Sequence, residues 1–212
     1  MTDTTQSLRT RLKNVAAEAL LDAAERVMIE KGYEKATMQD IAAAAGCAVG
    51  TLYVHFKNKE DLFRALVQRN AGEIMQQLTA ALEGVTDPVE RLRISVIEHL
   101  RWGFKHVDFV NMMCGALPMR YYDFKSRLDE LIADKEKECH GLELENIKAG
   151  QEAGKIRRDM PAEALMEMVD GFMMTMMDQF SARPGRYTLK LQERLTWGFI
   201  AGAIGGKGGK HV

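Results

Sequence analysis

The sequence predicts an all-α protomer of nine helices, and three observations support this prediction. Apolar residues recur with helical periodicity along most of the 212-residue chain, as helices with one buried face require. Sustained alternation of apolar and polar residues, the pattern of a half-buried strand, is nearly absent. Capping residues, glycines and prolines divide the periodic segments. The predicted helices span residues 11–31, 38–45, 48–55, 58–83, 88–106, 109–116, 118–153, 161–180 and 187–204.

The first three predicted helices are separated by residues suited to turns. Gly32 follows the first helix, and glycine takes the left-handed conformation that ends a helix at low cost. Thr37 begins the second helix, because its hydroxyl can accept from a first-turn amide while Asp40 completes a pair resembling a capping box. Gly46 then breaks this helix. The sequence therefore predicts two short helices joined by a tight turn.

Two later helices have equally clear start signals. Asn58 with Asp61 is a cap for the fourth helix. Asp87 precedes Pro88, which is a capping aspartate followed by proline at the first helical position. These signals predict an N-terminal three-helix domain over residues 10–57, a C-terminal helical domain over 58–205 and a flexible, glycine-rich tail over 206–212.

Composition places the chain among globular proteins, with 46% hydrophobic and 28% charged residues. No run of about 18 apolar residues exists, so no membrane span is expected. The N-terminal residues have no apolar leader behind them. The cysteines (Cys47, Cys114 and Cys139) are odd in number and widely spaced, which argues against a disulfide framework and for a reducing, cytoplasmic location.

The distribution of charge is more informative than the formal net charge of −1. From Ile41 to Lys59 there is no acidic residue, and this window contains His55 and Lys57 as well as Lys59. A local cationic face on a nearly neutral protein is sufficient for contacts with phosphates. An acid-free stretch of this length can also arise by chance.

The acid-free window coincides with a helix-turn-helix pattern. Residues 37–56 have the sequence TMQDIAAAAGCAVGTLYVHF. Small alanines lie where two helices must cross, Gly46 provides the turn, and Ile41 and Leu52 supply an apolar contact between the helices. The second helix of such a motif enters the DNA major groove, where donor and acceptor patterns distinguish the base pairs. Double-stranded DNA is therefore the expected partner.

At these residues the chain resembles the TetR family of bacterial transcriptional regulators. The resemblance runs from about residue 17 to residue 67 and includes AERVMIEKGY, TMQDIA, AGCAVGTLYVHF and KNKEDL. It implies an N-terminal DNA-binding domain and a C-terminal domain for ligand binding and dimerisation. It also implies that the residues matching Thr37, Thr51, Tyr53, His55 and Lys59 approach DNA. Beyond residue 67 the likeness is limited to the number and length of the helices.

Eight residues are predicted to contact DNA, and several have an alternative structural role. Thr51 would face base edges, whereas the Tyr53 hydroxyl and His55 would donate to phosphates, unless they pack into the three-helix core. Thr37 can be a helix cap, a phosphate contact or both. The arm containing Arg9, Arg11 and Lys13 is expected to be disordered, with minor-groove binding as the alternative. The predicted DNA-contacting residues are Thr37, Ala48, Val49, Thr51, Tyr53, His55, Lys57 and Lys59.

The C-terminal domain is rich in methionine and aromatic residues, which can line an adaptable apolar pocket. We expect an apolar small-molecule effector there, although any single one of these residues can equally be ordinary core. The predicted pocket residues are Trp102, Phe104, Met112, Met113, Tyr122, Phe172, Met173 and Met177.

The last two predicted helices favour a homodimer. Gly198 and Gly202 are four residues apart and permit close helix approach, so these helices would form a four-helix interface with a second copy. Two-fold symmetry predicts a palindromic operator. The predicted interface residues are Met166, Met176, Leu191, Leu195, Gly198, Phe199 and Gly202.

Signatures of enzymatic chemistry are not found in the sequence. It has no nucleophile elbow, no phosphate-binding glycine loop and no paired catalytic carboxylates in context. His99 and His106, and the cluster around Cys139 and His140, do not have zinc-like spacing, so neither a metal nor a cofactor is expected. The prediction is a ligand-released repressor. A small helical enzyme or carrier and a ligand-independent DNA-organising protein are the alternatives.

Overall fold

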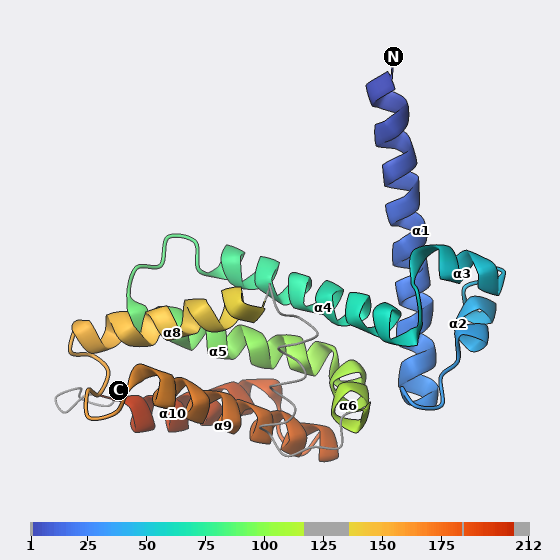
Figure 1. The fold of residues 1–212 in the computed structure, drawn as a ribbon. Coiled ribbons are helices and arrows are strands. Elements are labelled where there is room, and N and C mark those ends of the chain that lie inside the picture. Colours follow the sequence, from blue (N-terminus) through green and yellow to red (C-terminus); the bar gives the residue numbers. More distant parts are fainter. Residues whose placement is uncertain (1, 117–135, 184, 206–212) are drawn as a thin grey trace. The chain divides into compact units, whose positions relative to one another are not determined.

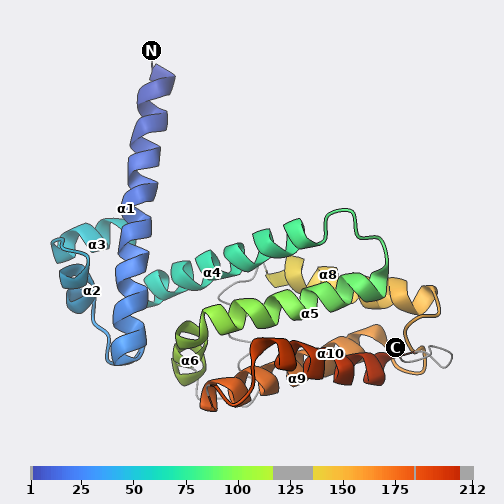
Figure 2. The same cartoon turned by 180° about the vertical axis from the view of Figure 1, so that it is seen from behind.

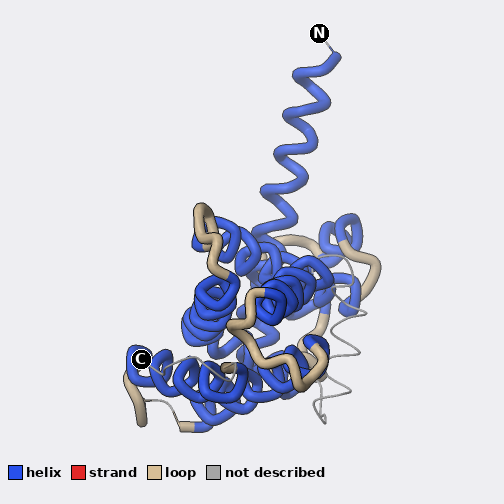
Figure 3. The backbone as a smooth tube through the Cα atoms, turned by 90° about the vertical axis from the view of Figure 1, so that its left-hand side faces the viewer, coloured by secondary structure: helices blue, strands red, loops and turns tan. Residues whose placement is uncertain are grey.

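A computed structural model describes residues 2–116, 136–183 and 185–205, and these residues are almost entirely helical (Figures 1 and 3). The prediction of an all-α fold is confirmed. The described part of the chain contains no strand, apart from one isolated β-bridge between Ile156 and Gly205. Its helices are α1 (Thr2–Lys31), α2 (Met38–Ala44), α3 (Val49–His55), α4 (Lys59–Ala81), α5 (Pro88–Lys105), α6 (Val107–Ala116), α8 (Glu136–Glu152), α9 (Ala162–Ala182) and α10 (Leu189–Ile204).

The chain forms two compact units. The first contains the described residues up to Asn70 together with 108–116, and the second contains 71–107 and the described residues from 136 onward. This division differs from the predicted boundary after residue 57, because the first half of α4 and most of α6 group with the N-terminal helices. The opening of the predicted helix 118–153 and the predicted tail 206–212 lie outside the described residues.

Helix α1 begins at Thr2, nine positions before the predicted start at residue 11. Arg9, Arg11 and Lys13 therefore lie in a helix rather than in the disordered arm that we expected. Neither glycine nor proline occurs between Thr2 and Lys31, and this segment is rich in residues with good helix propensity, so nothing ends the helix locally. The amphipathic pattern on which the sequence prediction depended begins only later, where α1 contributes buried side chains.

The core of the first unit is built from one face of each helix. Leu20, Ala24 and Met28 are buried on α1, Ile41 on α2 and Leu52 on α3. Helix α2 packs against both α1 and α3. The unit therefore holds α3 in place through buried apolar contacts, which dominate the stability of a packing of this kind.

An ion-pair network joins α1 to α4 within the first unit. The Arg69 guanidinium lies 2.7 Å from Asp22 and 3.5 Å from Glu18, and it also binds Glu25. The three carboxylates are spaced along one face of α1, because residues four and three apart in a helix are neighbours on its surface. This network fixes the first half of α4 against α1.

The second unit has α5 near its centre, packed against α8, α9 and α10 (Figure 2). Its core includes Leu92, Val96 and Leu100 of α5 with Ile147 of α8 and Ile200 of α10. Asp87 caps α5 as predicted, since its carboxylate accepts from the backbone N–H groups of residues 89 and 90. No helix in the described part of the chain is long and apolar enough to cross a membrane.

Candidate functional site

Helices α2 and α3 form two seven-residue helices joined by a tight turn, as the sequence predicted. The turn uses Gly46 at a φ of 67°, a left-handed conformation that glycine adopts without a steric penalty. Its backbone is closed by hydrogen bonds from Gly46 N–H to the Ala43 carbonyl and from Cys47 N–H to the Ala42 carbonyl. The arrangement is a helix-turn-helix.

Helix α3 has one buried face and one exposed face. Leu52 is fully buried in the first unit, and Phe56 immediately after the helix is also buried. Tyr53 is 51% exposed and Val54 is 73% exposed. Thr51 and Ala48 are exposed, while Val49 and His55 are half-buried. Packing through Leu52 thus leaves the other side of α3 accessible to a partner.

Thr37 is a helix cap in the structure. Its hydroxyl accepts from the Asp40 backbone N–H (3.1 Å), and Asp40 Oδ2 accepts from the Thr37 backbone N–H (3.2 Å), which completes the predicted capping box. The hydroxyl also donates to Asp40 Oδ2 (2.8 Å). The Lys31 ammonium donates to the same carboxylate at 2.7 Å. That hydrogen bond, followed by the one from Thr37, holds the pKa of Asp40 below its usual value. The charge of Asp40 is therefore paired next to the exposed face of the motif.

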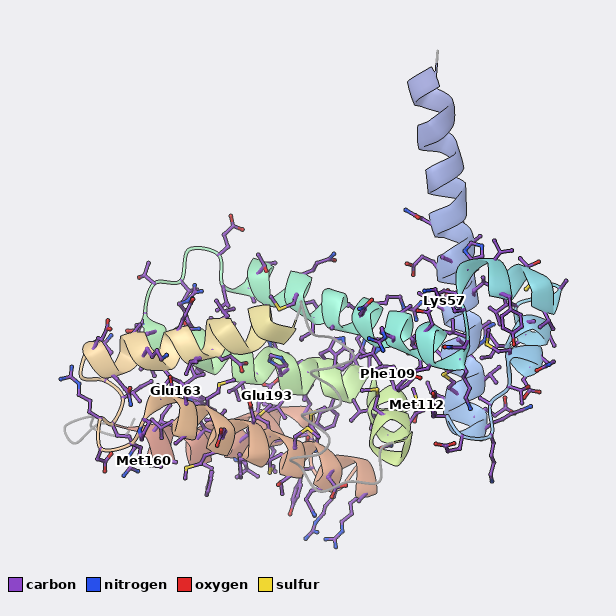
Figure 4. The ribbon with its side chains drawn as sticks, viewed as in Figure 1. Lys57, Phe109, Met112, Met160, Glu163 and Glu193 are labelled. Atoms are coloured by element: carbon purple, nitrogen blue, oxygen red, sulfur yellow. The ribbon has the colours of Figure 1, made fainter. Side chains whose placement is uncertain are left out.

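Two lysines flank α3 and differ in their surroundings. Lys57 lies between α3 and α4 with an exposed side chain (Figure 4). The Lys59 ammonium instead donates to the backbone carbonyls of Tyr33 (2.8 Å) and Glu34 (3.1 Å), and lies 4.5 Å from the centre of the Tyr33 ring. An ammonium has three N–H donors, so one remains for a third acceptor. Lys59 therefore joins the start of α4 to the segment that follows α1, and one N–H donor of its ammonium remains.

The start of α4 also matches the sequence prediction. Asn58 Oδ1 accepts from the Asp61 backbone N–H at 2.7 Å, and Asp61 Oδ2 accepts from the Lys57 backbone N–H at 2.9 Å. This reciprocal pair resembles a capping box and fixes the segment between α3 and α4.

Comparison with known proteins identifies the motif. Residues 20–66 match the family model described as bacterial regulatory proteins of the tetR family. This region contains the end of α1, the complete helix-turn-helix and the first third of α4. Over these residues the chain is similar to the tetR family of bacterial regulatory proteins.

The curated relatives of this chain fall into two groups by the share of each protein that is aligned. An HTH-type transcriptional regulator of Mycobacterium tuberculosis is 36% identical over 97 residues, which are 46% of this chain and 48% of that protein. The chain thus spans about half the length of that relative. The fatty acid metabolism regulator of Bacillus subtilis is 25% identical over 154 residues, 72% of this chain and 76% of that protein. The probable acrEF/envCD operon repressor of Escherichia coli is 29% identical over 174 residues, with coverages of 78% and 73%.

Solved structures of other regulators share their fold with most of the chain. The fatty acid degradation regulator FadR of Bacillus halodurans aligns with a TM-score of 0.76 at 24% identity, covering 88% of this chain and 95% of that chain. FadR of Bacillus subtilis, solved in complex with stearoyl-CoA, aligns with a TM-score of 0.77 at 20% identity, covering 88% and 98%. At these identities the likeness concerns the fold alone.

The residues predicted to line a ligand pocket are divided between the two units. Trp102, Phe104, Phe172, Met173 and Met177 belong to the second unit. Among them Met173 is buried, and Phe104 and Phe172 are half-buried against the core cluster. Trp102 stacks on His106 with ring centres 4.6 Å apart.

The remaining predicted pocket residues lie elsewhere. Met112 and Met113 are buried on α6 and group with the first unit; Figure 4 labels Met112 and its neighbour Phe109. Tyr122 lies outside the described residues. These methionines were predicted from the methionine-rich composition of the C-terminal half. Composition alone does not determine which of the two units contains a given buried side chain.

The residues predicted at a dimer interface differ in exposure. Leu195 and Phe199 are 48% and 60% exposed, and Gly198 and Gly202 are exposed beside them on α10. Leu191 and Met176 are half-buried. Met166 is only 4% exposed and belongs to the core of the second unit, so the expectation that it meets a second copy is corrected. Met168, which the sequence prediction omitted, is 59% exposed on α9.

The two histidines considered as metal ligands each face a carboxylate. His99 Nδ1 lies 3.3 Å from Glu143, and His106 Nε2 lies 3.4 Å from Glu73. Among the residues whose positions are described, no group of three or more His, Cys, Asp or Glu side chains is placed to hold a metal ion. The two histidines therefore face two separate carboxylates, His99 on α5 and His106 directly after it.

Proposed function

We propose that this chain is a sequence-specific DNA-binding regulator of transcription that acts as a homodimer in the cytoplasm. It would be a repressor, released from a palindromic operator by an apolar small molecule. The observation that carries the proposal is the exposure of α3: its buried side is held by Leu52, and its accessible side bears no acidic residue. Curated relatives named as repressors, including BepR of Brucella suis, support the repressor role.

In this proposal α3 lies in the major groove of DNA. Thr51 would contact base edges, while the Tyr53 hydroxyl, His55 and the two lysines would bind phosphates on either side. Ala48 and Val49 would let the start of α3 approach closely because their side chains are short. Thr37 would reach a phosphate only by sharing the hydroxyl that now serves Asp40. The proposed DNA-contacting residues are Thr37, Ala48, Val49, Thr51, Tyr53, His55, Lys57 and Lys59.

The homodimer would form through α9 and α10. The exposed apolar side chains of Met168, Leu195 and Phe199 would be buried against a second copy. Gly198 and Gly202 have no heavy atom within 4 Å of where a Cβ would stand, which leaves room for a partner helix to approach. Two-fold symmetry would place two α3 helices about 34–36 Å apart or somewhat more.

The effector would bind among the apolar residues of the second unit. A ligand that prefers a state with a different spacing of the α3 helices would shift the population and lower DNA affinity. Helix α4 would carry this change, since it is one continuous helix with residues in both units. The Bacillus subtilis regulator solved with stearoyl-CoA makes a long-chain acyl thioester the first compound to test here.

The test is selection of bound sequences from a random DNA pool at fixed physiological salt. Enrichment of a palindrome would support a dimeric, sequence-specific regulator and would provide the probe for ligand screening. Release of that probe by stearoyl-CoA, but not by coenzyme A alone, would support the apolar effector. A folded dimer that enriches no sequence, with and without the acyl thioesters, would contradict the proposal.

A further inference from the structure

Among the side chains whose exposure the structure describes, the most exposed large hydrophobic one lies on α3. Val54 is 73% exposed, more than the partly apolar Tyr53 beside it at 51%. An isolated exposed valine is common on protein surfaces and needs no explanation. Val54, however, lies on a helix that is proposed to enter a DNA groove, so its exposed side chain would face the bases.

Val54 lies on the outermost side of α3. It follows the fully buried Leu52 by two residues, which places the two side chains roughly 200° apart around a helix with 3.6 residues per turn. Thr51 and Gly50 precede Val54 by three and four residues, so they share its face. Tyr53 points instead toward the flank, about 100° from Leu52.

The backbone around Val54 is open to close approach. A Cβ built at Gly50 would meet no heavy atom within 4 Å, so the helix has a smooth, shallow surface one turn before Val54. This face therefore presents the two methyl groups of Val54 and the side chain of Thr51 without a long side chain in front of them.

The size and charge of this face indicate which kind of partner it fits. One valine beside one threonine is far smaller than the roughly 800 Å² that each partner buries in a standard protein–protein interface. No acidic residue occurs between Ile41 and Lys59, whereas Lys57 and His55 lie next to the patch. A small apolar spot with basic flanks fits DNA, and the apolar group that the major groove exposes is the C5-methyl of thymine.

We propose that Val54 packs against a thymine methyl group and thereby specifies one T·A base pair in each half-site. This inference rests on the proposed function. It assigns base discrimination to a residue whose side chain cannot form a hydrogen bond. Thr51 would contact the edge of a neighbouring base. Tyr53 and Lys57 would bind the DNA backbone and so fix the position of α3 along the groove.

The experiment replaces thymine by uracil, which removes only the methyl group. Each thymine of the selected half-site is exchanged in turn on both halves of the palindrome, and affinity is measured for the wild type and for Val54→Ala. The wild type should lose about fourfold per half-site at one position, the effect of about 0.8 kcal/mol per buried methyl-sized group. Val54→Ala should bind thymine DNA more weakly by a similar factor and should respond little to uracil at that position.

Three controls keep the outcome interpretable. Val54→Thr retains one methyl and nearly the same shape, so it should lie between wild type and alanine in its response to uracil. Thermal unfolding of all three proteins should coincide, because the side chain is exposed. Val15→Ala changes another exposed valine, 68% exposed on α1, and should leave the uracil response unchanged.

The failure of this assignment can be told apart from failure of the regulator itself. If the wild type binds its selected palindrome but uracil has no effect at any position, Val54 reads no methyl group and only this inference is overturned. The same holds if Val54→Ala responds to uracil as strongly as wild type. If the wild type selects no sequence, the proposed function fails and this inference fails with it.

Discussion

At the residue scale, the Tyr53 hydroxyl offers a minimal change on the exposed side of α3. Tyr53→Phe removes one oxygen from a side chain that is 51% exposed, so the unfolding temperature should not change. If the hydroxyl donates to a phosphate, the free energy of DNA binding should become less favourable by about 1 kcal/mol per half-site. Fluorescence anisotropy with the selected palindrome measures this loss. Tyr187→Phe, at a 39% exposed tyrosine near α10, is the matched control. Unaltered affinity of Tyr53→Phe would remove the hydroxyl from the DNA contacts.

Substitution of the two lysines should distinguish an effect on DNA binding from an effect on stability. The log of DNA affinity falls as the log of salt concentration rises. Lys57→Ala should make this slope less steep by about 0.9 for each phosphate that the ammonium neutralises, without affecting stability. Lys59→Ala should reduce that slope as well. In addition, it should lower the free energy of unfolding by about 1 kcal/mol, because its ammonium binds the Tyr33 and Glu34 carbonyls. Salt titrations and urea unfolding of both variants test this. Equal stability of the two variants would contradict the structural role of Lys59.

At the element scale, the start of α5 depends on Asp87, whose carboxylate caps the helix and pairs with Lys155. The hydrogen bond from Lys155, with the bond from the Glu90 backbone N–H, holds the pKa of Asp87 below its usual value. A depressed pKa in the folded state means that the stabilisation is complete above the unfolded value near 3.8 and is lost as the pH falls through the folded value.

Two substitutions divide the contributions of Asp87. Asp87→Asn keeps an acceptor for the cap but loses the charge, so its stability should fall less steeply than that of wild type as the pH is lowered below about 4. Asp87→Ala should also lose the cap, at a cost of about 1 kcal/mol at neutral pH. Urea unfolding at a series of pH values tests both statements. Identical acid profiles for wild type and Asp87→Asn would show that the Lys155 pair contributes nothing.

A second element-scale prediction concerns the contact between α5 and α9. A Cβ at Gly103 would overlap the end of the Met177 side chain. In a helix interior, alanine is normally more stabilising than glycine by up to about 1 kcal/mol. Gly103→Ala should therefore be more favourable in a Met177→Ala background than in wild type, by at least about 0.5 kcal/mol. A double-mutant cycle by urea unfolding measures this coupling, and additive effects would mean that Met177 does not pack on Gly103 in solution.

The elements themselves were largely predictable from local chemistry. Thr37, Asn58 and Asp87 cap helices as expected, because capping depends on neighbours within a few residues. The start of α1 was predicted too late, because the first residues of this helix have no apolar period in the sequence to detect. The burial of Met166 and the grouping of α6 with the first unit are consequences of tertiary packing, which the pattern of a single helix does not contain.

At the scale of the whole molecule, the proposed regulator would combine a DNA-binding unit and a ligand-responsive dimerisation unit within one chain. The helix-turn-helix of the first unit was predictable, because this motif depends on residues close in sequence. Val54 was not among the predicted residues, since only its exposure in the structure distinguishes it from the apolar residues around it. The residues of the proposed effector site were harder to predict, because the candidate methionines belong to both units.

The measurement that tests the central claim most directly is the dependence of DNA affinity on half-site spacing. The selected palindrome is compared with versions in which about 5 or about 10 base pairs are inserted between its halves, and with a single half-site. A two-fold dimer should bind the original spacing best, lose most of its affinity when the halves are half a turn out of phase, and bind the single half-site weakly. Equal affinity for all four DNAs would contradict a symmetric dimer that recognises a palindrome through its two α3 helices.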